Sequence, residues 1–224
     1  MNILPFTFHG AALAALPSGA LHWAAESLLV VSDLHLGKAA RQARHGGAQL
    51  PPYEVRETLD RLAADLDATG ARRVICLGDS FDAAGLDEEL PKPDLATLAR
   101  MQAGRDWTWI EGNHDPGPVA LGGAHRAAVA LGPLVFRHIA SPAMGEVSGH
   151  YHPKARLVLR GRAITRPCFL MDAARLILPA YGTYTGGLAC DSAVLDGMMG
   201  PGAEVILTGP APCRIPMPRR AVAG

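Results

Sequence analysis

The chain has 224 residues, of which 49% are apolar and 19% are charged, and its 21 Lys and Arg balance its 21 Asp and Glu. This composition is typical of a well-buried core and excludes a low-complexity or disordered chain. The balanced charge gives no support for a nucleic-acid partner, and no apolar run reaches the roughly 18 residues of a membrane helix. The N-terminal segment lacks a basic stretch, so we expect no export signal and a cytoplasmic protein without a membrane partner.

The first half of the chain alternates strand and helix patterns. Residues 21–33 predict a hairpin whose second arm, LLVV, is a buried strand. Residues 53–70 carry apolar side chains at helical spacing and predict a helix that stops at Gly70. VICLGD then predicts a buried strand, PDLATLARMQAG a helix and WTWIEGNHD another strand. Strands that alternate with helices indicate βαβ units and a largely parallel sheet.

The second half of the chain changes character. RAAVALGPLVFRH, ARLVLRGRAITRPCFLMD and ARLILPAYG predict β-rich segments joined by short or Gly-containing turns, and AEVILTG and PCRIPMP add two short strands. We therefore expect an α/β first half. In the second half we expect antiparallel strands that extend or cover the core. The sequence predicts a single domain over 1–224, with functional motifs at 33–152 and a β-rich portion at 154–215.

Polar motifs follow several of these apolar runs. VVSDLH, ICLGDSFD and WIEGNHD each place polar groups where a buried strand ends, and ligands of open α/β sheets bind beyond those ends. The candidate metal ligands in these motifs and in the later FRH and GHYH are Asp33, His35, Asp79, Asn113, His138, His150 and His152. Nitrogen and oxygen ligands without sulfur favour Mn²⁺, Fe, Co²⁺ or Zn²⁺ over Mg²⁺ or Ca²⁺. With one bridging carboxylate, this set predicts two divalent ions and phosphoryl chemistry, with Mn²⁺ as the favoured metal.

Spacing gives some of these residues a more definite role. Asp33 and His35 lie two apart, so an extended backbone would point both side chains to the same side. His150 and His152 repeat that spacing. Asp82 could support a neighbouring ligand, or be an ordinary loop or helix-cap aspartate.

GNHD also contains candidate catalytic groups. His114 is a candidate proton donor, and Asp115 is placed to orient or charge it. Taken alone, the tripeptide Asn-His-Asp would be a polar turn. Taken alone, His138 would be a structural histidine.

As an ordered set, DLH, GDSFD, GNHD, His and GHYH resemble the five-block pattern of the calcineurin-like metallophosphoesterase superfamily. The resemblance implies a four-layer sandwich of two mixed β-sheets flanked by helices. It implies one metal held by Asp33, His35, Asp79 and His152, and another held by Asp79, Asn113, His138 and His150. It also implies that His114 assists the leaving group. Where that family often has Gly after the lone histidine, this chain has Ile139.

A narrower resemblance covers nearly the whole chain. LHWAAESLLVVSDLHLGKAA, GARRVICLGDSFD, SGHYHP, RPCFL and LILPAYGTYTGG are similar to the bacterial ligase-associated DNA damage response endonucleases, the PdeM family. It implies a DNA endonuclease linked to repair, in functional association with a DNA ligase, a helicase and an exonuclease. Whether the chain forms a homo-oligomer stays open.

Local charge bears on the DNA prediction. Lys38, Arg41 and Arg44 are spaced three apart beside the first motif and could hold phosphates, or could form a solvated helix face. The stretch from Lys154 to Arg166 holds five basic residues and no acid, and we expect a plain solvent-facing surface there rather than a DNA track. Tyr181 or Tyr184 could contact substrate.

Two other functions fit the same motifs. The substrate could be a nucleotide, a cyclic nucleotide or a lipid-linked pyrophosphate, because these share the phosphodiester or phosphoanhydride core. The chain could also be a non-catalytic scaffold on the same fold. Such scaffolds lack the proton donor of the third motif, and the presence of His114 disfavours that reading.

Overall fold

The computed structural model describes residues 2–44, 46, 51, 53–83, 85, 90–117, 120–159 and 161–220. In this part of the chain the helices are α1 (Lys38–Arg44), α2 (Glu54–Thr69), α4 (Lys92–Gln102) and α5 (Ala193–Met198), with a 3-10 turn at Ala24–Glu26. None of the described helices has the length and apolar character needed to cross a membrane.

The first sheet has seven strands in the order β1-β2-β3-β4-β5-β6-β7 among the described residues. They are β1 (Leu4–Phe8), β2 (Ala11–Ala15), β3 (Leu21–Trp23), β4 (Leu28–Val31), β5 (Arg73–Leu77), β6 (Asp106–Ile110) and β7 (Ala124–Arg126). Strands β1 to β4 pair antiparallel and β4 to β7 pair parallel. The parallel half is the βαβ region that the sequence predicts, and it aligns the carboxyl ends of β4, β5 and β6 at one edge.

Within the described ranges, the second sheet has eight strands, ordered β15-β14-β12-β13-β10-β9-β8, with β11 paired to β12 off this path. They are β8 (Ala128–Leu131), β9 (Leu134–Arg137), β10 (Glu146–Ser148), β11 (Lys154–Leu159), β12 (Arg162–Met171), β13 (Arg175–Ile177), β14 (Glu204–Leu207) and β15 (Cys213–Pro216). Most neighbours in this sheet pair antiparallel as expected, but β10 pairs parallel with both β9 and β13, which makes the sheet mixed. The connections from β9 to β10 and from β10 to β13 therefore cross over, because parallel neighbours cannot be joined by a hairpin.

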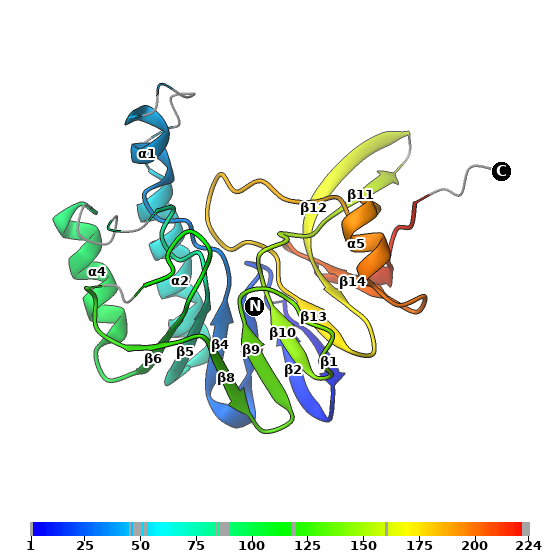
Figure 1. Ribbon diagram of the computed structural model, residues 1–224, viewed down its shortest axis with the longest axis horizontal. Coiled ribbons are helices and arrows are strands. Elements are labelled where there is room, and N and C mark those ends of the chain that lie inside the picture. Colours follow the sequence, from blue (N-terminus) through cyan, green and yellow to red (C-terminus); the bar gives the residue numbers. More distant parts are fainter. Residues whose placement is uncertain are drawn as a thin grey trace.

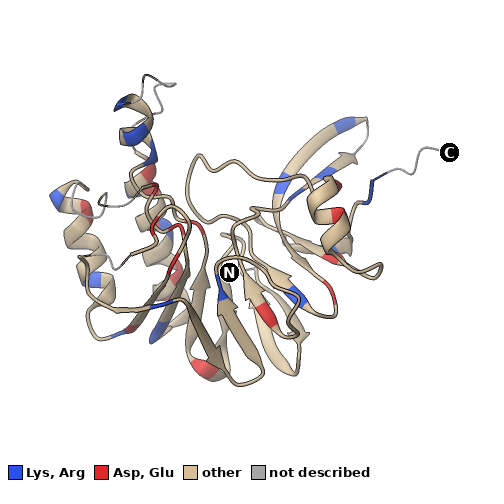
Figure 2. Ribbon diagram, in the orientation of Figure 1, with Lys and Arg blue, Asp and Glu red and all other residues tan. Residues whose placement is uncertain are grey.

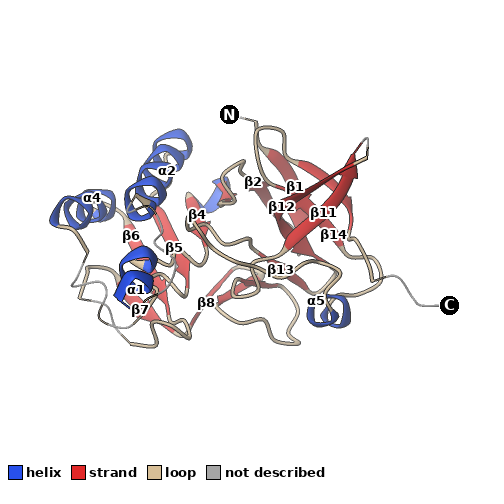
Figure 3. Ribbon diagram, turned by 90° about the horizontal axis from the view of Figure 1, so that it is seen from above, coloured by secondary structure: helices blue, strands red, loops and turns tan. Residues whose placement is uncertain are grey.

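Three apolar clusters hold the layers together. The central cluster joins residues of both sheets, such as Leu77 of β5 and Phe136 of β9, both fully buried. A second cluster packs α2 and α4 onto the first sheet, and a third packs α5 against the second sheet. The expected sandwich of two mixed sheets flanked by helices is therefore confirmed. Figure 3 shows α2 and α4 beside β4 to β6, with α5 well apart from them.

Helix α2 has the amphipathic pattern that the sequence predicts. Val55, Leu59, Leu62 and Leu66 are all buried, while the helix ends in Gly70 with a φ of 62°. Trp107 and Trp109 on β6 are each 2% exposed and belong to the core. Two arms project from this body to the same side, helix α1 and the β11–β12 hairpin (Figure 1).

Candidate metal centre

The candidate ligands lie on the loops that follow β4, β5, β6, β9 and β10, so both sheets contribute to one site. The carboxyl ends of neighbouring parallel strands meet at the same sheet edge, which is why residues far apart in the sequence converge here. Figure 2 shows acidic residues gathered at this end of the first sheet, between the basic residues of α1 and those of the β11–β12 hairpin.

The first group of ligand atoms comes from Asp33, His35 and His152, whose donor atoms lie within 4.8 Å of one another. Nε2 of His152 is 3.0 Å from Oδ1 of Asp33. These two atoms and Nε2 of His35 are buried and have no hydrogen-bond partner in the described part of the chain. Buried polar atoms are almost always paired, so three orphaned donors and acceptors facing one point fit a bound cation.

Asp33 is held so that one oxygen stays available. Its Oδ2 accepts hydrogen bonds from the Ser32 hydroxyl and, at 3.0 Å, from the backbone N–H of His150. Its Oδ1 is the atom left to face His152. Ser32 belongs to no recognisable ligand motif, and its position before a strand-end aspartate was the only signal for this role.

The second group comes from Asp79, His138 and His150. Nε2 of His138 lies 3.3 Å from Oδ2 of Asp79 and 3.2 Å from Nδ1 of His150. It also lies 2.9 Å from Oδ1 of Asn113. The other ring nitrogen of His138 is 2.8 Å from the carbonyl of Leu77. A hydrogen bond from Nδ1 to that carbonyl leaves Nε2 with a lone pair for a metal, as in many metal-binding histidines.

Asp79 lies between the two groups. Its Oδ2 is 3.3 Å from His138 and 4.0 Å from Nε2 of His35, while its Oδ1 accepts a 2.9 Å hydrogen bond from the backbone of His114. Burial alone would raise the pKa of Asp79. The hydrogen bonds from His138 and His114, with the charges of His138 and His35, outweigh burial and lower the pKa to about 2.

The pKa values of the two histidines in the second group are shifted in opposite directions. Burial opposes protonation of His138, but its hydrogen bond with Asp79 and the charges of Asp33 and Asp79 raise its pKa above the usual value. Burial, followed by the charge of His138, lowers the pKa of His150. The negative field that favours a proton on His138 equally favours a metal cation at that point.

Asp82 connects three residues around the first group. Its Oδ1 lies 2.9 Å from Nδ1 of His35, its Oδ2 accepts a hydrogen bond from Arg41, and its carbonyl lies 3.1 Å from Nδ1 of His114. Burial would raise the pKa of this carboxyl, but His35 and Arg41 lower it. Arg41 is thus engaged with Asp82, whereas Lys38 and Arg44 lie at the two ends of α1, partly buried and exposed respectively.

The expectation that Asp115 orients His114 was wrong. The carboxylate of Asp115 accepts hydrogen bonds from the backbone N–H groups of Ser80, Phe81 and Gly112 at 2.8, 3.2 and 3.1 Å. Burial, assisted by the charge of Asp79, raises its pKa to about 6 against these hydrogen bonds. Asp115 therefore ties the GNHD loop to the GDSFD loop, and it is Asp82 that contacts the His114 ring.

The backbone around the site adopts left-handed conformations. Positive φ values occur at Asp33 (52°), His35 (45°), Asp79 (45°), His150 (68°) and His152 (46°). Such conformations cost about 1–3 kcal/mol each in non-Gly residues and concentrate at functional sites. Gly78, with a φ of 72°, lies so close to His138 that a Cβ there would be 2.5 Å from the imidazole ring. The glycine is therefore required to seat His138.

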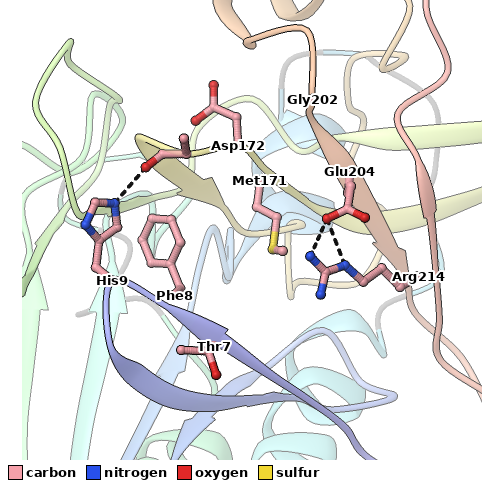
Figure 4. A pocket seen from close by; sticks show the side chains of 9 residues that line it. Thr7, Phe8, His9, Met171, Asp172, Gly202, Glu204 and Arg214 are labelled. Atoms are coloured by element: carbon pink, nitrogen blue, oxygen red, sulfur yellow. Dashed lines mark hydrogen bonds and ion pairs between the residues drawn. The ribbon is translucent and has the colours of Figure 1, made fainter.

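A different cavity, of about 350 Å³, lies away from these ligands and is shown in Figure 4. Its polar side chains are satisfied within the protein. Nε2 of His9 lies 2.8 Å from the carbonyl of Ala173, and Arg214 forms two hydrogen bonds to Glu204. It offers no unpaired group of the kind found in the candidate metal centre.

Comparison with known proteins supports the fold. No protein-family model matches the chain, and no curated protein matches it in sequence. Among solved structures, the chain is similar to the crystal structure of Pseudomonas putida nuclease MPE. The TM-score is 0.72 at 28% sequence identity, and the match covers 95% of this chain and 100% of that one.

Proposed function

We propose that this chain is a metal-dependent phosphodiesterase that cleaves nucleic acid and acts as a DNA endonuclease. The observation that carries the proposal is the position of Asp79 Oδ2, 3.3 Å from His138 and 4.0 Å from His35, between two groups of nitrogen and oxygen donors. A carboxylate shared in this way is the feature expected of a dinuclear centre. The similarity to a nuclease over nearly the full length of both chains supports the same reaction class.

We assign the ligands from the two donor groups. One cation would be held by Asp33, His35, Asp79 and His152, and the other by Asp79, Asn113, His138 and His150. The absence of sulfur from both sets favours Mn²⁺, with Fe, Co²⁺ and Zn²⁺ as alternatives. When bound, two divalent cations lower the pKa of water and neutralise charge on the phosphate oxygens.

His114 is the residue we assign to the leaving group. Its Nδ1 lies 3.1 Å from the carbonyl of Asp82 and its backbone N–H is held by Asp79, so the ring position is fixed from two sides. With Nδ1–H donated to Asp82, the proton on Nε2 of the protonated ring is the one available to the departing oxygen.

The substrate assignment has a separate basis. The balanced charge of the chain does not predict DNA. DNA, the link to repair, and association with a DNA ligase, a helicase and an exonuclease rest on the resemblance to the ligase-associated endonucleases. The α1 cations beside the centre, Lys38 and Arg44, are assigned to neighbouring phosphates on charge alone.

The test is the metal content of the purified protein combined with a substrate panel. We expect close to two Mn²⁺ per chain after loading, hydrolysis of bis(p-nitrophenyl) phosphate, and cleavage of circular single-stranded DNA, which has no ends. His114→Ala should keep its metal and lose at least a hundredfold in kcat. His22→Gln, on β3 outside the centre, is the matched control.

The outcomes separate the parts of the proposal. Near-wild-type turnover by His114→Ala would remove the role of His114. Hydrolysis of cyclic nucleotides or pyrophosphates without cleavage of any DNA would replace the nuclease function by a small-molecule one. A protein that binds no metal would refute the centre itself.

A further inference from the structure

A second cavity, of about 390 Å³, lies beside the loop that supports the metal centre. It is enclosed by α2, by the segment after β13 and by β11, and its lining includes Arg61, Lys154, Tyr184, Ser18, Thr185 and Thr208. No acidic side chain lines it in the described part of the chain. Two cations in a lining without a carboxylate suit an anion, while the hydroxyl groups of Ser18, Thr185 and Thr208 donate within the protein.

The two cations come from different elements and are held in place. Arg61 of α2 lies over the ring of Tyr181 at 4.8 Å and donates a hydrogen bond to the Tyr181 carbonyl. Its Nε is buried without a hydrogen-bond partner among the described residues. Lys154, at the start of β11, donates a 3.1 Å hydrogen bond to the carbonyl of Thr185, which uses one of the three hydrogens of its ammonium group.

One carboxylate, that of Asp65, interacts with Arg61 and Ser18 of the lining but does not itself line the cavity. Asp65 of α2 is buried, and its Oδ2 accepts a 2.8 Å hydrogen bond from the Tyr181 hydroxyl. This contact engages Tyr181, which is 1% exposed, and excludes it as a substrate contact. Tyr184 is 40% exposed and lines the cavity with a φ of 60°. A strained backbone that holds an aromatic ring toward solvent points to a binding role.

The wall of this cavity is in direct contact with the candidate metal ligands. The backbone N–H of Gly182 donates to the carbonyl of Asp33 at 3.1 Å, and a Cβ on Gly182 would lie 2.0 Å from the Leu34 carbonyl. On the other side, Lys154 follows His152 by two residues. This cavity therefore adjoins the metal centre through Gly182 and the His152–Lys154 segment.

We propose that this cavity is a phosphate subsite for the nucleic-acid strand, in which Arg61 and Lys154 bind a backbone phosphate and the Tyr184 ring contacts a base. The inference rests on the proposed function and deepens it. Arg156 lies two residues after Lys154 on β11, on the same face and about 7 Å further along, and it is exposed. The hairpin that we expected to be a plain surface thus continues the cationic path away from the centre (Figure 2).

The test is equilibrium binding of a short fluorescein-labelled single-stranded oligonucleotide in EDTA, so that neither metal nor cleavage contributes. Lys154→Gln should weaken binding roughly fivefold and reduce the dependence of log K on log salt by about 0.7, the value for one phosphate on a single strand. Tyr184→Ala should weaken binding roughly tenfold with the salt dependence unchanged. Lys154→Arg keeps the charge and should bind as the wild type does.

The control variant is Arg100→Gln, which removes an exposed positive charge from α4, far from the cavity. Equal binding by Lys154→Gln and Arg100→Gln would overturn the subsite, as would no binding of the oligonucleotide by the wild type. Thermal melting of each variant checks its fold. Cleavage of the same oligonucleotide with Mn²⁺ is measured separately: binding that depends on Lys154 without any cleavage would leave the subsite standing and sink the nuclease function.

Discussion

The imidazole Nδ1 of His35 lies 2.9 Å from Oδ1 of Asp82, with both side chains almost fully buried. This contact turns Nε2 of His35 toward the first donor group and makes the ring a better ligand. Asp82→Ala should therefore weaken Mn²⁺ binding by about 10–100-fold, measured by calorimetric titration of metal-free protein. Asp106→Ala, an exposed carboxylate at the other end of β6, is the control. Unchanged affinity in Asp82→Ala would show that Asp82 does not support the ligand.

Gly78→Ala should displace His138. The new Cβ would lie 2.5 Å from the imidazole ring, at a φ of 72°. We expect the metal content to fall from two ions per chain toward one, measured by elemental analysis after loading, with stability lowered by about 1–3 kcal/mol. Gly104→Ala is a matched control, because its φ is 73° and nothing lies within 4 Å of the added Cβ. Gly104→Ala introduces the same backbone strain but no steric clash. Metal loss in both variants would therefore contradict a specific role for Gly78.

Metal binding should stabilise the fold. Asp33 Oδ1, His35 Nε2 and His152 Nε2 are buried without partners, and a cation would satisfy all three. With free Mn²⁺ at 100 times its Kd, the free energy of unfolding should rise by about 3 kcal/mol per independent site, measured by urea unfolding. His152→Ala should lose much of this gain, while His22→Ala, outside the centre, should keep it. An unfolding midpoint of the wild-type protein that does not change with Mn²⁺ would rule out a specific site.

The Asp65 carboxyl should make stability depend on pH. Burial raises its pKa above the ordinary value of 3.8, against hydrogen bonds from Ser18 and Tyr181 and the charge of Arg61. The folded state then binds this proton more tightly than the unfolded state. The stabilisation from this group is complete below pH 3.8 and is lost as the pH rises through the raised pKa.

Asp65→Asn lacks this titration. The difference in unfolding free energy, wild type minus variant, should therefore be largest in acid and shrink toward neutral pH. Urea unfolding of both proteins across that range measures it. Asp67→Asn, on the exposed side of the same helix, controls for removing a carboxylate from α2. A wild type-minus-variant difference that stays constant with pH would contradict the assignment.

The periodic elements could be predicted from the sequence because burial sets their pattern. The helix that ends at Gly70, the strands before Asp33 and Asp79 and the strand before GNHD were all predicted. The parallel pairing of β10 was not, because its three residues are too short to carry a period and its partners β9 and β13 are distant in sequence.

The candidate site was predicted by residue type more than by geometry. Asp33 and His35 do share one donor group, but both residues have left-handed backbones instead of extended ones. His150 and His152 have the same spacing, yet they face different groups. The hydrogen-bond partners of Asp115 are backbone amides, and every residue type except proline has one. The residue types in the motif therefore could not predict that Asp115 connects two loops.

The left-handed ligand residues have a consequence for how the centre is filled. Five of the candidate ligands have left-handed backbones, and hydrogen bonds between the loops hold Asp33 and Asp79 in place, so the fold itself sets the arrangement of donors. A cradle of that kind can release one divalent ion and accept another while the chain stays folded. Which ion occupies it in a cell then follows from local supply and exchange rates more than from any refolding around a preferred metal.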